Sequence, residues 1–301
     1  MSTPRVTITD PRGPGPAVPE RLRAWVALMK PRIIELLLIT TVPAMILAEG
    51  GWPDTWLVVA TVVGGTLSAG GANAINNVAD RDLDAKMRRT AHRPLPAHRV
   101  GPTEALVVGL VAGAAGFAIL AAAVNLASAL LATGALAFYV FVYTLLLKRS
   151  TAQNIVIGGA AGAVPVLVGW AAVTGGVGLP AWVMFAVVFF WTPPHFWALS
   201  LRFREDYERA GVPMLPVVAG VAATVRQIGM YSILLAGVSL LLQPVAGLGM
   251  VYLGAASLLG AWFIVEAARL AATPDRAILV FRASNIYLTL LFAAIAVDVL
   301  V

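Results

Sequence analysis

The chain has 301 residues, of which 59% are hydrophobic and only 12% are charged, about half the charged share of an average soluble domain. The apolar residues come in long runs rather than in stripes with a polar face, which predicts an all-α integral membrane protein. The alternating ten-residue strands of a membrane β-barrel are absent from the sequence. Because there is no cysteine, disulfides, thiolate metal sites and thiol nucleophiles are excluded.

The first thirty residues contain Pro, Gly and Arg together with Asp10 and Glu20, and they include no apolar core. This composition fits neither a secretory signal peptide nor a transit peptide. We therefore expect residues 1–30 to be a flexible cytoplasmic tail and residues 31–301 to form one intramembrane domain. The lack of a transit peptide favours the plasma (inner) membrane of a prokaryote.

Nine apolar runs follow the tail, and each is long enough to cross a bilayer as a helix. The division between the third and fourth runs rests only on the short break at Val124–Asn125. The runs cover roughly 33–50, 56–76, 103–124, 126–146, 153–174, 179–200, 227–246, 249–270 and 282–301.

The positions of the basic residues predict the orientation of these runs. If the N-terminus is inside and the nine runs alternate, all 21 Lys and Arg residues fall before the first run, in the inner connections or at the run ends that border them. The N-terminus is then expected in the cytoplasm and the C-terminus outside. The net charge of +6 belongs to cytoplasmic loops in this interpretation, so no nucleic-acid partner is expected. Two inner connections are long, about 77–102 and 201–226, and function is expected there.

The first long inner connection begins with an unusual polar pattern. Asn76, Asp80 and Asp84 are spaced in steps of four, which places them on one face of a helix, one turn apart. An amide oxygen and two carboxylates form the kind of hard-oxygen cluster that Mg²⁺ prefers, and a cation removes the cost of carboxylates near hydrocarbon. Asp206, in the second long inner connection, is a candidate fourth metal ligand. Asp82 points away from this face and is interpreted as a local salt-bridge partner.

Basic side chains of the inner connections are candidates to surround an anion. Arginine suits the paired oxygens of a phosphate, and lysine suits a single contact. A site for a diphosphate substrate is expected to combine carboxylates that hold a metal ion with basic side chains that contact the phosphate oxygens. A solvated topogenic loop with local pairs such as Arg202–Asp206 remains an alternative. The candidate diphosphate ligands are Arg81, Lys86, Arg88, Arg93, Lys148, Arg149 and Arg202.

The string FFWTPPHFWALS contains His195, the one histidine inside a predicted span. Pro193 and Pro194 are expected to break or kink that helix and to make room for a ligand. An ionisable side chain within a span suggests a functional site, although a histidine bonded to a neighbouring carbonyl is the alternative. The small-residue strings GGTLSAGGANA and IGGAAGA predict close helix packing, which is compatible with a cavity for an isoprenoid chain.

The string NNVADRDLDAKMRRTAHRP resembles the first aspartate-rich motif of the UbiA-type intramembrane prenyltransferases. The strings KPRIIELLLITT, YTLLLKRSTAQNIVIGGAAGAVPVLVGW, WTPPHFWALSLRFREDYERAGVPMLPV and FRASNIYL are similar to the haem-farnesylating branch of that family. The resemblance covers roughly Lys30 to Leu288. It implies a nine-helix fold with a cytoplasmic-side active site that transfers the farnesyl group of farnesyl diphosphate to a vinyl group of haem B. Water addition then gives haem O and diphosphate.

The resemblance also implies roles for individual residues. Asn76, Asp80 and Asp84 match the Mg²⁺–diphosphate motif, and Lys148 and Arg149 match a diphosphate-binding string. The wider family has an aspartate where Arg202 stands, so Arg202 is assigned to phosphate, and Asp206 to metal or to orienting Arg202. The haem side is expected to include His195, Trp191 and Tyr207. The implied surroundings are the lipid bilayer, with haem A synthase or oxidase assembly factors as candidate protein partners.

Three other interpretations stay open at this point. A prenyltransferase of the same fold that acts on another aromatic acceptor, such as a quinone precursor, is the first, and the PPHFW string argues against it. A transporter would show inverted repeats and broken helices in both halves, whereas the charges here collect at one face. A structural haem-binding membrane protein would have no need for Asp80 and Asp84 and would usually carry paired histidines.

Overall fold

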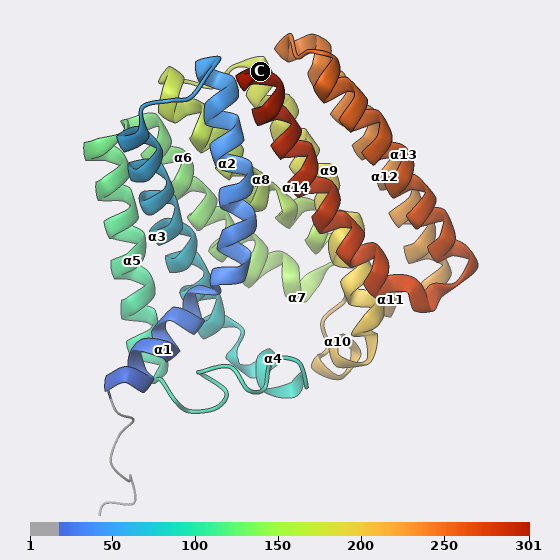
Figure 1. Ribbon diagram of the computed structural model, residues 1–301. Coiled ribbons are helices and arrows are strands. Elements are labelled where there is room, and N and C mark those ends of the chain that lie inside the picture. The colour runs from blue at the N-terminus through green and yellow to red at the C-terminus, as the bar shows by residue number, and fades with distance from the viewer. Residues whose placement is uncertain (1–17) are drawn as a thin grey trace, which may run out of the picture.

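The computed structural model describes residues 18–301 and is all-helical over that range (Figure 1). Short helices α4, α10 and α11 and two single turns lie between the long helices. In chain order the elements are α1 (Val18–Met29), α2 (Pro31–Glu49), α3 (Thr55–Ala79), α4 (Arg81–Lys86), α5 (Pro102–Ala123), α6 (Leu126–Ala137), the π-helix η1 (Phe138–Leu147), α7 (Lys148–Ser150), α8 (Asn154–Thr174), α9 (Leu179–Arg202), α10 (Arg204–Ala210), α11 (Leu215–Val218), α12 (Gly220–Ala246), α13 (Met250–Ala272), the 3₁₀ turn η2 (Pro274–Arg276) and α14 (Ala277–Leu300).

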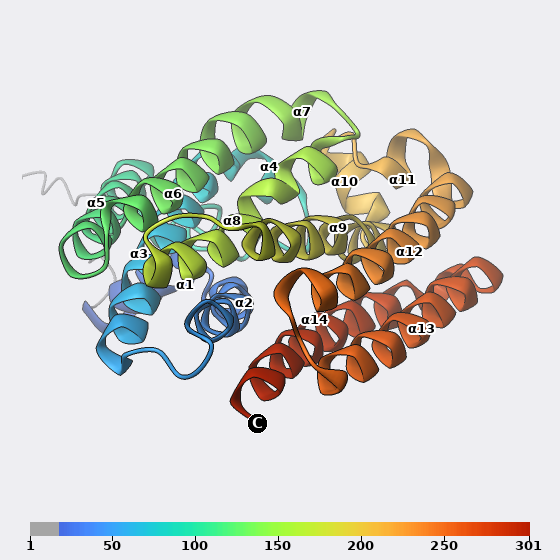
Figure 2. The ribbon, with the colours of Figure 1, turned by 90° about the horizontal axis from the view of Figure 1, so that it is seen from above.

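The long helices close into a bundle around α8 and α9. Helix α8 packs against α2, α6 and α9, while α9 continues the contact to α12 and α14 (Figure 2). Helix α14 returns to pack against α2, so the last helix of the chain contacts the first long one. The two ends of the helical region therefore pack against each other.

Eight helices of the described region are long and apolar enough to cross a membrane. The segment α6–η1–α7 counts as one of them, over Leu126–Ser150, and α2 contributes a shorter apolar helix, Leu38–Glu49. The all-helical membrane fold is confirmed, whereas the count of nine spans stays a prediction. The predicted break at Val124–Asn125 is confirmed, because the side chain of Asn125 caps α6 by accepting the Ser128 N–H at 2.8 Å.

The predicted inner connections gather at one end of the bundle. Figure 1 shows α1, α4 and α10 at that end and the C-terminus at the opposite end. This arrangement agrees with the one-sided distribution of basic residues along the chain. Which end faces the cytoplasm stays a prediction.

Ordered structure begins earlier than the sequence predicted. Residues 18–29, assigned to a flexible tail, form α1, which packs against α3 and α5. Ala24 and Leu28 lie one turn apart on its buried face and contact a cluster that includes Ala74 and Ala105. Charged residues lie on both sides of this short apolar stripe, so the sequence shows no long apolar run here. Residues 1–17 lie outside the described part.

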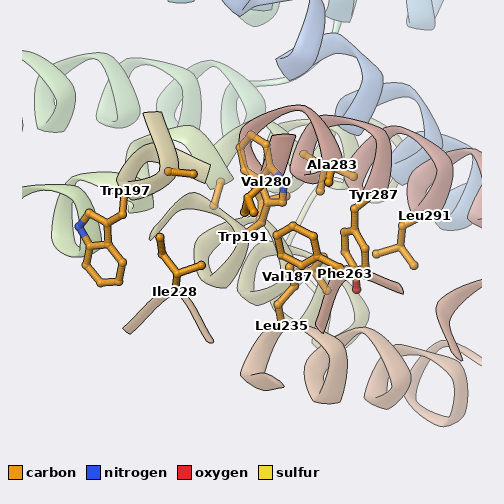
Figure 3. Packing of buried hydrophobic residues seen from close by; sticks show 14 of the residues in the cluster. Val187, Trp191, Trp197, Ile228, Leu235, Phe263, Val280, Ala283, Tyr287 and Leu291 are labelled. Atoms are coloured by element: carbon orange, nitrogen blue, oxygen red, sulfur yellow. The ribbon is translucent and has the colours of Figure 1, made fainter. Parts of the chain in front are cut away.

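The largest apolar cluster lies where α9 meets α12, α13 and α14 (Figure 3). Trp191 of α9 lies there with Phe263 and Tyr287 from the last two long helices, while Trp197 lies farther along α9 on the side of Ile228. Pro193 and Pro194 were expected to break or kink this helix; a break is not found, because α9 runs without interruption from Leu179 to Arg202, and the kink stays a prediction. Neighbouring helices enclose this stretch, and such packing tolerates proline inside a membrane helix.

Glycines let α3 and α5 approach each other closely, as the small-residue strings predicted. A Cβ atom added at Gly71 would lie 2.6 Å from the carbonyl oxygen of Gly109 and 2.7 Å from the amide nitrogen of Gly113. A Cβ added at Gly116 would lie 2.7 Å from the carbonyl oxygen of Gly64. These neighbours are backbone atoms, so the helices themselves would have to separate.

We therefore expect Gly71→Ala to destabilise the protein by about 1–3 kcal/mol, the usual cost of overpacking. Gly65→Ala is the matched control, because a Cβ added at Gly65 meets nothing within 4 Å. Thermal unfolding in detergent, followed by tryptophan fluorescence, should give a lower midpoint for the first variant only. Equal midpoints would show that α3 and α5 can separate without cost.

Candidate active site

The junction of α3 and α4 carries the aspartate-rich motif. Asp80 ends α3 and begins α4, yet the helical hydrogen bonding continues across it. The Asp80 N–H donates to the Asn76 carbonyl at 2.9 Å, and the Asp84 N–H donates to the Asp80 carbonyl at 2.8 Å. The steps of four predicted from the sequence are therefore preserved.

Asp80 is the most deeply buried acidic side chain of this motif, with 0% of its surface exposed. Its Oδ2 accepts a hydrogen bond from Asn76 Nδ2 at 2.7 Å and forms an ion pair with Lys148 Nζ. Its Oδ1 is buried and has no hydrogen-bond partner in the described part of the chain. A buried carboxylate oxygen without a partner is costly, so this atom marks a place for an additional cation or donor.

Asp84 is held by a second cation, Arg93, from the loop after α4. Arg93 Nη1 donates to both carboxylate oxygens of Asp84, at 3.0 and 2.9 Å. Thr90 fixes the same loop by donating its hydroxyl to the Asp84 carbonyl oxygen at 3.0 Å. Arg93 keeps 25% of its side-chain surface exposed, so it can also reach a ligand beside Asp84.

Lys30 belongs to this cluster, although we interpreted it only as an inner-face charge from the sequence. It precedes α2, and its Nζ donates to Asn76 Oδ1 at 2.7 Å. Burial, together with the positive charges of Arg93 and Lys148, lowers the pKa of Lys30 to about 7, although the negative charges of Asp80 and Asp84 raise it. An anion placed among these cations would stabilise the charged form of all three. The sequence places this lysine directly before a proline that begins a span, but it does not indicate that Lys30 reaches Asn76.

The π-helix η1 carries the remaining groups of the cluster. Thr144, which is 0% exposed, donates its hydroxyl to the Tyr139 carbonyl oxygen at 2.8 Å and contacts Asn76 Nδ2 at 3.0 Å. Lys148 follows directly after η1. π-Helices are rare and frequently occur at functional sites. Neither η1 nor the role of Thr144 was predicted, because apolar periodicity does not distinguish this helix type.

Asp82 and Arg149 form a separate pair on the outer side of the same segments. Arg149 donates to both Asp82 carboxylate oxygens, at 2.9 and 2.8 Å, and to the Ala79 carbonyl oxygen at 2.8 Å. The hydrogen bonds from Arg149 lower the pKa of Asp82 to about 2. The pair lines an apolar groove of about 560 Å³ with Arg81. Asp82 was predicted as a local ion-pair residue, whereas Arg149 was predicted among the diphosphate ligands and does not join the cluster.

Asp206 lies in a third group, where α10 meets the loop after α4. It accepts the Arg89 N–H at 3.2 Å and an Arg209 side-chain N–H at 3.0 Å. Burial raises the pKa of Asp206, but the hydrogen bonds from the backbone N–H groups of Arg89 and Arg88 and from Arg209 lower it below its usual value. Arg202 stacks over the Phe203 ring at 5.9 Å instead of pairing with Asp206. The predicted orientation of Arg202 by Asp206 is therefore not found.

The other predicted diphosphate ligands, Arg81, Lys86 and Arg88, are exposed at the same end of the bundle. No group of three or more His, Asp or Glu side chains within the described residues is close enough to hold a metal ion. Asp80, Asp84 and Asp206 are thus not gathered around one point. The donor set still fits Mg²⁺, because Asn76, Asp80 and Asp84 offer oxygens on one face and Asp80 Oδ1 lacks a partner.

His195 joins α9 to α14. Its Nδ1 lies 2.8 Å from Ser284 Oγ, and Ser284 donates its hydroxyl to the Phe281 carbonyl oxygen at 2.7 Å. The hydroxyl hydrogen is thereby used, so His195 Nδ1 carries the hydrogen and Nε2 keeps a lone pair in the neutral ring. Trp191 stacks on His195 with ring centroids 4.2 Å apart. Tyr207, the third predicted haem-side residue, instead accepts a hydrogen bond from Arg89 at 3.4 Å.

Comparison with known proteins agrees with this geometry. Residues 37–292 match the UbiA prenyltransferase family. The chain belongs to the UbiA prenyltransferase family. A relative from Parafrankia sp., named protoheme IX farnesyltransferase, is 55% identical and covers 95% of this chain and 93% of its own.

Two solved structures share the UbiA fold. One is described as digeranylgeranylglyceryl phosphate synthase, with a TM-score of 0.76, 18% identity and coverage of 93% of this chain and 99% of that chain. The other is a UbiA homolog from Archaeoglobus fulgidus bound to DMAPP and Mg²⁺, with a TM-score of 0.67, 17% identity and coverage of 91% and 99%. Family membership favours prenyl transfer over the transporter and structural interpretations.

The adjacent residues Lys148 and Arg149 allow a sharp test of the cluster. Lys148→Gln should lower kcat for prenyl transfer by about 10²–10³, the usual effect of removing one preorganised electrostatic contact. Arg149→Gln should retain most of the wild-type rate, because Arg149 binds Asp82 on the outer side. Thermal unfolding checks that both variants are folded. Equal losses in the two variants would place Arg149 in the diphosphate site after all.

Proposed function

We propose that the chain is a Mg²⁺-dependent protohaem IX farnesyltransferase that transfers the farnesyl group of farnesyl diphosphate to a vinyl group of haem B. Water addition gives haem O, and diphosphate is released. The observation that carries this proposal is the 55% identity, over nearly the whole chain, with a relative of that name. The buried cluster of carboxylates and cations supports it, because a diphosphate needs such surroundings.

The diphosphate side of the site consists of Lys30, Arg93 and Lys148. These cations come from three different segments and lie close enough to one another for their charges to interact. Arg93 pairs with Asp84 and Lys148 pairs with Asp80, while Lys30 donates to Asn76 Oδ1. When the diphosphate binds, the same ammonium and guanidinium groups can take over its oxygens and stabilise the negative charge that builds up on the leaving group.

Asn76, Asp80 and Asp84 are the residues that would hold Mg²⁺. A bound Mg²⁺ supplies charge stabilisation at the phosphate oxygens. The UbiA homolog from Archaeoglobus fulgidus, bound to DMAPP and Mg²⁺, supports the assignment of the metal. Asp80 Oδ1 is the atom of this set that has no protein partner in the described residues, and we assign it to the metal.

The reaction breaks the bond between the allylic C1 of the farnesyl group and its diphosphate oxygen. The vinyl carbon of haem B forms the new carbon–carbon bond, and water adds to the cation that remains on the haem substituent. The remaining proton of that water passes to diphosphate, so atoms and charge balance. Asn76 and Asp80 are only 2% and 0% exposed, so the residues of the cluster limit the access of bulk water to the allylic carbon.

We assign His195 and Trp191 of α9 to the haem side. The support is the position of the ring: Ser284 Oγ lies 2.8 Å from His195 Nδ1, and Trp191 stacks on the imidazole. The proposal also includes nine spans, an N-terminus and active site on the cytoplasmic side of a prokaryotic inner membrane, and haem A synthase or oxidase assembly factors as partners.

Purified protein in lipid or detergent should convert haem B and farnesyl diphosphate to haem O only when Mg²⁺ is present. Mass spectrometry of the extracted haem should show the hydroxyethylfarnesyl substituent, and EDTA should abolish it. Prenylation of another aromatic acceptor, with haem B unchanged, would keep the family chemistry and refute the haem assignment.

Substitutions in the aspartate-rich motif provide the controls for this assay. Asp80→Ala and Asp84→Ala should abolish transfer while the protein remains folded in detergent. Asp82→Ala is the matched variant, because Asp82 pairs with Arg149 away from the cluster. Near-normal turnover by either Asp80→Ala or Asp84→Ala would refute the metal assignment.

His195→Ala should weaken haem binding more than diphosphate binding. His195 is the one histidine of α9, whereas the proposed diphosphate cations Lys30, Arg93 and Lys148 come from other elements. A titration of haem followed at its Soret band, beside a calorimetric titration of inorganic diphosphate with Mg²⁺, separates the two affinities. Equal loss of both would indicate that His195 serves only to pack α9 against α14.

A further inference from the structure

Thr144 is a buried hydroxyl inside η1 that the reaction itself does not use. Its surface is 0% exposed, and it has two hydrogen-bond partners. Thr144 Oγ1 lies 2.8 Å from the Tyr139 carbonyl oxygen and 3.0 Å from Asn76 Nδ2. A carbonyl oxygen can only accept, so the single hydroxyl hydrogen is donated to Tyr139. Thr144 Oγ1 must then accept a hydrogen bond from Asn76.

This constraint determines how the Asn76 amide is oriented. An amide has two N–H donors on nitrogen and an acceptor on oxygen, and a flip of the group exchanges them. Asn76 Nδ2 donates to Asp80 Oδ2 at 2.7 Å and to Thr144. Both donors are thereby used, and Oδ1 faces Lys30 Nζ at 2.7 Å. The amide oxygen is thus directed toward the cationic side of the cluster.

We propose that Thr144 is a positioning residue that holds the Asn76 amide with its oxygen toward the metal–diphosphate site. The inference rests on the proposed role of Asn76 in holding Mg²⁺. Magnesium binds oxygen ligands, so an Asn76 amide that flips would present nitrogen and lose a ligand. Without the Thr144 hydroxyl, one of the two Asn76 N–H donors has no acceptor, and the preference for the observed orientation is weakened.

The geometry of η1 makes this contact possible. In an α-helix a threonine hydroxyl bonds back to the carbonyl three or four residues earlier. Thr144 instead reaches the carbonyl of Tyr139, five residues earlier, which matches the wider π-helical turn. The same segment presents Lys148 to Asp80. One element therefore supplies both a direct cation and the hydroxyl that orients Asn76.

Three full-length variants test the proposal: Thr144→Val, which removes the hydroxyl and keeps the shape, Thr144→Ser, which restores the hydroxyl, and Thr133→Val as the control. Thr133 bonds to the Ala129 carbonyl oxygen at 2.8 Å in α6, away from the cluster. The probe is Mn²⁺ in the presence of inorganic diphosphate, with free Mn²⁺ measured by electron paramagnetic resonance. Thr144→Val should weaken Mn²⁺ binding by about tenfold, within the range for residues that support a metal ligand. Thr144→Ser and Thr133→Val should bind as the wild type does.

The outcomes separate this inference from the proposed function. If the wild type binds no Mn²⁺ with diphosphate, the metal assignment and the role of Thr144 both fall. If the wild type binds but Thr144→Val binds equally well, or if Thr144→Ser is as weak as Thr144→Val, only the positioning role is overturned.

A second background separates the orientation of the Asn76 amide from general packing around Thr144. In Asn76→Asp the carboxylate presents oxygen in either orientation, so Thr144→Val should cost much less Mn²⁺ affinity there than in the wild type. An equal cost in both backgrounds would show that Thr144 acts through general packing, and it would overturn the proposal.

Discussion

Asp80 and Asp84 lie at the junction of α3 and α4 with 0% and 3% of their surfaces exposed, so each negative charge requires a cation in direct contact. Lys148 satisfies this requirement from the end of η1, and Arg93 satisfies it from the loop after α4. These pairs hold the end of η1 and the loop after α4 beside the two aspartates. The same cations are then already in place when an anion arrives, which lowers the reorganisation that binding requires.

The segments that carry these charges place neighbouring side chains on opposite sides, one facing the interior of the bundle and the other facing the outer groove. Asp80 and Lys148 face inward and pair with each other, whereas their near neighbours Asp82 and Arg149 pair on the outer side. Residue type alone does not separate the two roles, because each pair consists of an aspartate and a basic residue. What separates them is the helical position of each side chain, which determines whether it meets the interior or the outer groove.

This distinction explains which parts of the site could be predicted. The steps of four from Asn76 to Asp84 and the outward direction of Asp82 are local helix geometry, and the structure has both. The grouping of Asp206 with Arg89, and the entry of Lys30 into the cluster, depend on contacts between segments 117 and 46 residues apart. A single sequence carries no signal for such contacts. The same applies to α1, because its short apolar stripe is explained only by its packing against α3 and α5.

The fold could be predicted from the sequence more directly than the site, because hydrocarbon permits few alternatives to the helix for each apolar run. The exceptions are places where the regular pattern is locally changed. Pro193 and Pro194 do not break α9, since neighbouring helices enclose them, while η1 widens without any proline or glycine among its ten residues. Tyr143 of η1 packs so closely on α8 that a Cβ at Gly158 would lie 2.3 Å from its ring. The tertiary contact with α8, rather than local preference, thus accommodates the wide helix and keeps Thr144 and Lys148 on the side of the carboxylates.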